Sequence, residues 1–94
     1  MTSDSADVNC DEFARACALA GFLAEQGVAS LQFETGTACV EMIARHTDLP
    51  RAIVELPEGS AIKSDTPPRF RVWREAGTLC IQSEDAALLR AFGA

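Results

Sequence analysis

The stretch from Ala16 to Ala24 contains no polar side chain, and it constrains the fold more than any other segment of the sequence. A helix-start pattern at Asn9 and a helix-stop glycine at Gly27 bracket it, which predicts a helix over residues 10–26. Such a helix is apolar around most of its circumference, so a sheet packed on one side cannot cover it. Either the C-terminal helix or a second molecule must cover the rest. Small residues permit close helix approach, so we expect a homodimer interface at Ala16, Ala20, Gly21 and Ala24.

Length and charge limit the classes of protein to which this chain can belong. With 94 residues, of which 48% are hydrophobic, it predicts one domain over residues 1–94 with a disordered tail over residues 1–8. The net charge of −6 argues against a general nucleic-acid binder. Residues 1–44 carry the whole excess of acid, which favours a basic protein partner.

The start of the chain is polar and acidic, unlike the basic start of a signal peptide. The apolar stretch is also too short to cross a bilayer, so we expect a cytoplasmic protein that does not bind membranes. Cysteines occur without metal-binding spacing and are expected to be buried free thiols; they are Cys10, Cys17, Cys39 and Cys80. His46 has no nucleophile beside it in the sequence, so we expect no catalytic site, no metal and no cofactor.

Residues 29–42 alternate between apolar and polar side chains on both sides of Thr35-Gly36. With these two residues as the turn of a hairpin, Leu31 lies opposite Val40 and the apolar residues of both strands share one face. The sequence therefore predicts two antiparallel strands here.

Residues 38–56 also permit an alternative interpretation. Their apolar spacing fits two helices, and the segment resembles the helix-turn-helix of winged-helix regulators. That alternative implies a DNA-binding transcriptional regulator whose wing is the hairpin at 70–83, with Arg69, Arg71 and Arg74 in contact with phosphates. We favour strands, because Pro57 would end the second helix early and Glu55 makes that helix a poor reader of DNA.

The remaining elements follow from alternation and turn residues. Ala52, Val54 and Leu56 predict a third strand, followed by a polar connection that reaches residue 68. A second hairpin follows, with its turn at Ala76-Gly77, and a short helix over 86–92 ends the chain. The predicted fold is α+β, an antiparallel sheet of about five strands flanked by an N-terminal and a short C-terminal helix.

The segment FARACALAGFLAEQGVASLQFE, the hairpin after it and the terminal amphipathic helix resemble the class I chaperones of type III secretion. That resemblance implies an acidic dimer that binds the N-terminal segment of an exported protein. The chain is also similar in size and charge to small acidic inhibitors such as anti-CRISPR proteins.

Alternation along residues 69–74 places Arg69, Arg71 and Trp73 on one outer face. Arginine and tryptophan are enriched in the central contacts of protein interfaces. With the acidic residues Glu34 and Glu41, they are the candidate partner-binding residues. We therefore predict a non-enzymatic module that holds or blocks a protein partner, for which nucleic acid is a poor ligand.

Overall fold

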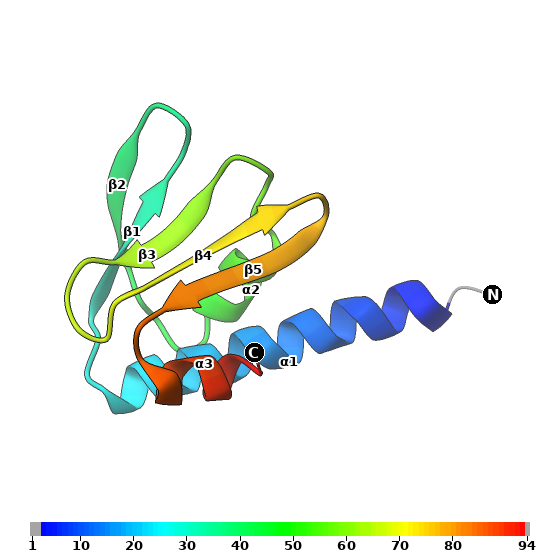
Figure 1. The fold of residues 1–94 in the computed structure, drawn as a ribbon, viewed down its shortest axis with the longest axis horizontal. Helices are drawn as coiled ribbons and strands as arrows, with labels where there is room; N and C mark the ends of the chain where they lie inside the picture. The colour runs from blue at the N-terminus through cyan, green and yellow to red at the C-terminus, as the bar shows by residue number, and fades with distance from the viewer. Residues whose placement is uncertain (1–2, 94) are drawn as a thin grey trace.

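The computed structural model describes the backbone of residues 3–93 and the side chains of residues 11–93. The helices are α1 (Ser3–Glu25), α2 (Leu49–Val54) and α3 (Ala86–Phe92). The strands are β1 (Ser30–Glu34), β2 (Cys39–Ile43), β3 (Ala61–Ser64), β4 (Phe70–Glu75) and β5 (Thr78–Ser83). The strands form one antiparallel sheet in the order β2-β1-β3-β4-β5, with α1 and α3 beneath it (Figure 1). The predicted α+β fold is confirmed.

Helix α1 begins at Ser3, earlier than the predicted helix over residues 10–26. Asn9 consequently lies inside the helix and does not mark its start. No glycine or proline occurs between residues 3 and 10, so nothing in that segment interrupts the helix. Its C-terminal end is as predicted: Gly27 has a φ of 76°, and the Val28 N–H donates to the Leu23 carbonyl at 3.0 Å.

The β4–β5 hairpin has the predicted register, with Val72 opposite Ile81 and Arg74 opposite Leu79. Its turn residues Ala76 and Gly77 both have positive φ angles, 53° and 81°. A two-residue turn with this backbone matches the right-handed twist of the strands that it joins.

The β1–β2 hairpin exists, but its turn lies one residue later than predicted. Thr35 and Ala38 exchange two backbone hydrogen bonds, of 2.8 and 3.3 Å, which leaves Gly36-Thr37 as the turn. The register therefore shifts by two residues, and Leu31 lies opposite Met42 rather than opposite Val40. A shift of two preserves the side-chain faces, so the predicted sorting of apolar from polar residues holds.

The predicted third strand at Ala52, Val54 and Leu56 is wrong. Residues 49–54 form α2, and the third strand is β3, inside the segment expected to be a polar connection. Pro50 in the first turn suits a helix, because its missing N–H has no helical partner at that position. Helix α2 packs against α1 and covers part of its apolar circumference.

The winged-helix alternative is also wrong, although it anticipated α2. Its first helix would occupy the residues that form β2, which pairs with β1 over five residue pairs. The 70–83 hairpin is accordingly part of the central sheet and not a wing beside a helix-turn-helix.

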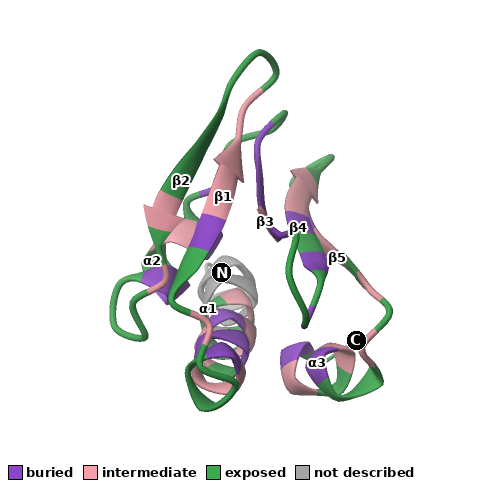
Figure 2. Cartoon of the chain, turned by 90° about the vertical axis from the view of Figure 1, so that its left-hand side faces the viewer, coloured by how far each residue is buried: buried purple, intermediate pink, exposed green. Residues whose placement is uncertain are grey.

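One hydrophobic core lies between the sheet and the helices (Figure 2). Its largest fully buried side chains come from all three helices and from β1, β3 and β4; they are Leu19, Leu23, Leu31, Leu49, Ile53, Ile62, Val72, Leu88 and Phe92. Helix α3 packs on α1, and Asp85 directly before it is its N-cap: the Asp85 side chain accepts a hydrogen bond from the Leu88 N–H at 3.1 Å. Because all three helices contribute to this core, they lie on one face of the sheet and leave the other without a helical layer.

Candidate protein-binding surface

The face of the sheet turned away from the helices is here called the outer face. Strand registers place fourteen side chains on it: Ser30, Gln32, Glu34, Cys39, Glu41, Ile43, Ala61, Lys63, Arg71, Trp73, Glu75, Thr78, Cys80 and Gln82. In the described part of the chain, no helix packs over these residues. They therefore form a surface that the fold leaves open to a partner.

A compact cluster lies in the middle of the outer face. The Arg71 guanidinium lies over the Trp73 ring, 5.0 Å from its centroid, and Arg71 Nε donates to Glu34 Oε1 at 3.3 Å. Trp73 Nε1 donates to Glu75 Oε1 at 3.1 Å. Ala61 lies between Glu34 and Trp73 in register and is 0% exposed, so the side chains around it close over its small methyl group. These contacts hold an aromatic ring and a guanidinium group in a defined arrangement at the surface.

Charge on the outer face differs between its two halves. The charged residues that β1 and β2 place on this face are Glu34 and Glu41, whereas β3 and β4 place Lys63, Arg71 and Glu75 there. Arg69, directly before β4, adds to this mainly basic half. A partner that covers the whole face therefore meets acidic groups on one side and mainly basic groups on the other.

The basic half borders an open hollow of about 320 Å³. Nine residues line it: Lys63, Ser64, Asp65, Arg69, Phe70, Arg71, Gln82, Ser83 and Glu84. Arg69 Nε donates to the Asp65 carbonyl at 2.9 Å and Arg71 Nε to Glu34, so one nitrogen anchors each guanidinium. The terminal Nη groups of both arginines have no hydrogen-bond partner among residues 11–93. Two oriented guanidinium forks with unused donors suit carboxylate oxygens.

All five predicted partner-binding residues thus lie on or beside the outer face. The sequence placed Arg69, Arg71 and Trp73 together, and the registers bring Glu34 and Glu41 to the same surface. Sequence reasoning missed Lys63 and Ala61, because their segment was expected to be a connection. The alternation of Ala61, Ile62 and Lys63 was the available signal.

The structure does not expose all of the small residues of α1 that were expected to form a dimer interface. Ala16 and Ala20 are 0% and 2% exposed, and both belong to the core of the chain itself. They offer no surface to a second copy. Gly21 is half-buried beside His46, and Ala24 is exposed.

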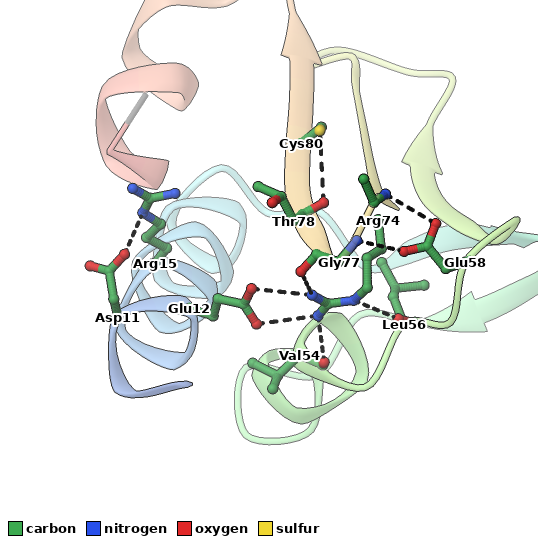
Figure 3. Close-up of polar contacts among 11 residues, drawn as sticks. Asp11, Glu12, Arg15, Val54, Leu56, Glu58, Arg74, Gly77, Thr78 and Cys80 are labelled. Atoms are coloured by element: carbon green, nitrogen blue, oxygen red, sulfur yellow. Dashed lines mark hydrogen bonds and ion pairs between the residues drawn. The ribbon is translucent and has the colours of Figure 1, made fainter. Parts of the chain in front are cut away.

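Arg74 does not face solvent, where the DNA-binding alternative required it. Its guanidinium donates to both carboxylate oxygens of Glu12, at 3.1 and 3.2 Å (Figure 3). It also donates to the carbonyls of Val54, Leu56 and Gly77, at 2.8–2.9 Å. Arg74 therefore links α1, the end of α2 and the β4–β5 turn inside the protein.

Cys17, Cys39 and Cys80 are free thiols, as predicted, but Cys39 is exposed and the other two are only half-buried. The prediction of buried thiols is therefore wrong for Cys39, whose Sγ lies 3.4 Å from Gln32 Oε1 on the outer face. The side chain of Cys10 lies outside the described residues. Among the helices described, none is long and apolar enough to cross a membrane.

Comparisons with known proteins found no relative of this chain. No protein family, no curated protein and no solved structure matches the chain.

Proposed function

We propose that this chain is a non-enzymatic protein-binding module whose outer face binds a partner protein. The observation that carries the proposal is the Arg71–Trp73 stack at the centre of a sheet face without a helical layer. Tryptophan and arginine contribute more binding free energy at protein interfaces than most other residues. The ring contributes apolar area and the guanidinium contributes directional donors.

The contacts also indicate the chemistry of the partner surface. The unused Nη donors of Arg69 and Arg71 favour carboxylates on the partner, next to the hollow. Glu34 and Glu41 favour lysine or arginine on the partner, over β1 and β2. The net charge of −6 adds long-range attraction to a partner that is basic overall.

The test begins with a tryptophan-to-alanine substitution. Immobilised wild-type protein and Trp73→Ala are used to capture proteins from an extract of the source cells, and the affinity of a captured partner is then measured by calorimetry. Loss of Trp73 is expected to raise the Kd about thirty-fold, which corresponds to about 2 kcal/mol. Phe13→Ala is the matched control, because Phe13 is an aromatic residue of α1 that is 50% exposed and lies off the outer face.

An equal Kd for wild-type protein and Trp73→Ala, with an unchanged circular dichroism spectrum, would contradict the proposal. The two modes of action are separated with the purified partner. A secretion-type chaperone binds an isolated N-terminal peptide of its partner, whereas an inhibitor binds the folded partner and lowers its activity.

A further inference from the structure

β2 is an edge strand that lacks the usual protection against pairing with another strand. It lies at the end of the sheet, and β1 is the element with which it makes its main contact in the described chain. Its sequence CVEMI has no lysine and no proline, and its five pairs with β1 contain no bulge. Natural proteins use these devices to block edge-to-edge pairing.

The same strand carries exposed apolar side chains. Three large hydrophobic residues are exposed among residues 11–93, and two of them, Val40 (56%) and Ile43 (64%), belong to β2 (Figure 2). Val40 is on the inner face, where it lies opposite Phe33, and Ile43 is on the outer face. An added strand along β2 would cover both side chains.

The hydrogen bonds of the β1–β2 hairpin show which backbone groups point outward. Thr35 bonds with Ala38, and the Ala44 N–H donates to the Ala29 carbonyl at 3.1 Å. Because hydrogen-bonded pairs alternate along an antiparallel ladder, the even-numbered residues of β2 bond to β1. The N–H and C=O groups of Cys39, Glu41 and Ile43 therefore point away from the sheet. The Ile43 carbonyl accepts from the Arg45 N–H at 3.1 Å, and a carbonyl oxygen has a second lone pair.

We infer that the occupant of this edge is β2 of a second copy, paired antiparallel about a two-fold axis at Met42. When two copies of β2 pair about a two-fold axis, residues directly opposite each other must lie on the same face of the sheet. The axis therefore passes through a residue of β2 and not between two residues, and the candidates are residues 40, 41 and 42. An axis at Glu41 places two carboxylates directly opposite each other, which is unfavourable. An axis at Val40 places no basic residue next to Glu41.

An axis at Met42 gives the most favourable contacts between the two copies of β2. Glu41 of each copy lies opposite Ile43 of the other, and their outward backbone groups hydrogen-bond. Arg45 of the second copy then lies diagonal to Glu41, within reach for an ion pair. The two Ile43 side chains also lie diagonal to each other across the axis and lose exposed area. The sheet continues across both copies, and the outer face of each copy stays open.

The first experiment measures mass in solution. Size-exclusion chromatography with light scattering is expected to give about twice the chain mass of 10.0 kDa. Ile43→Glu, which places a second carboxylate directly opposite Glu41 of the other copy, is expected to raise the dimer dissociation constant at least tenfold. Gln82→Glu is the matched control, because Gln82 is an exposed residue of the opposite edge strand, β5, and the dimer should persist.

The second experiment tests the register by disulfide formation in a Cys39→Ser background. Met42→Cys is expected to form a disulfide-linked dimer under mild oxidation, because two residues at a non-hydrogen-bonded two-fold pair lie about 4.5 Å apart at Cα. Val40→Cys is the control. Its copies lie about 13 Å apart along the strands in this register and should not link.

Three results overturn the inference: a monomer in the wild-type protein at all concentrations, a dimer unaffected by Ile43→Glu, or a link at Val40→Cys in place of Met42→Cys. A dimer insensitive to Ile43→Glu but disrupted by Ala24→Lys would move the interface to α1. These outcomes are independent of the proposed function, because Trp73→Ala leaves the edge intact and Ile43→Glu leaves the Arg71–Trp73 stack intact.

Discussion

Replacement of Arg74 by methionine is expected to destabilise the protein more than any other single change of a charged residue in the sheet. The Arg74 and Glu12 side chains are only 15% and 12% exposed, so water cannot replace the ion pair. Without Arg74, the Glu12 carboxylate stays buried without its partner. The carbonyls of Val54, Leu56 and Gly77 also lose their donor.

The magnitude follows from the burial of this pair. Removal of one member of a buried ion pair costs about 3–5 kcal/mol. A domain of this kind is stable by about 5–15 kcal/mol, so the variant should lose a large fraction of its free energy of unfolding. Urea unfolding followed by circular dichroism measures the difference.

Arg71→Met is the matched control, because the same residue type is replaced on the same strand. Arg71 pairs with Glu34 at side-chain exposures of 44% and 36%, and an exposed ion pair is worth less than about 1 kcal/mol. The double variant Arg74→Met/Glu12→Leu should recover part of the loss, because no unpaired carboxylate remains. If Arg74→Met cost no more than Arg71→Met, the assignment of Arg74 as the buried link between α1, α2 and the β4–β5 turn would be refuted.

Three further changes test the elements that frame the outer face, each by urea unfolding. Glu58→Ala should cost about 1 kcal/mol, because its carboxylate accepts from the Ala76 and Gly77 N–H groups at 3.2 and 2.7 Å; an unchanged midpoint would show that these bonds add nothing. Asp85→Ala should cost about 1 kcal/mol through loss of the α3 cap, whereas Glu84→Ala, at the neighbouring exposed acid, should change stability by less than about 0.5 kcal/mol. Ile53→Ala should cost about 2–5 kcal/mol, because Ile53 is fully buried in the core beside α1; a smaller loss would argue against helix α2.

The contrast between the two hairpins shows what local sequence can determine. Ala76-Gly77 suits a tight two-residue turn, and the position of this turn fixes the register of the strands on both sides, so β4–β5 was predictable in full. Around Gly36, two turns that differ by one residue both keep Leu31 and Phe33 on the inner face. Alternation cannot distinguish them, and the structure selects Gly36-Thr37.

Helix α2 was not predictable from its own residues. Ala52, Val54 and Leu56 alternate like a strand, while Leu49 and Ile53 are also spaced for a helix face, and six residues are too few for periodicity to decide. The deciding factor is α1, whose apolar surface needs cover on more than one side. Once α2 occupies that place, the sheet takes its third strand from residues 61–64.

The candidate binding residues also include some that local spacing could place and others that only the order of the strands could place. Alternation within one strand was enough to place Arg71 and Trp73 together, because neighbours two apart share a face. The additions of Glu34 and Lys63 depend on strand order, which places β3 between β1 and β4. Alternation assigns Arg71 and Arg74 to opposite faces of β4, but only the fold brings Glu12 of α1 to the buried Arg74.

The sequence by itself determined the helix ends at Gly27 and Gly93, the β4–β5 hairpin and the α+β class, since these depend on residues close together in the chain. Tertiary structure alone decided the conformation of residues 49–64, the neighbours of each strand and the burial of Arg74. The physical reason is that these features depend on free energy from contacts between segments far apart in the sequence. The spacing of apolar and polar residues within one segment does not indicate such contacts.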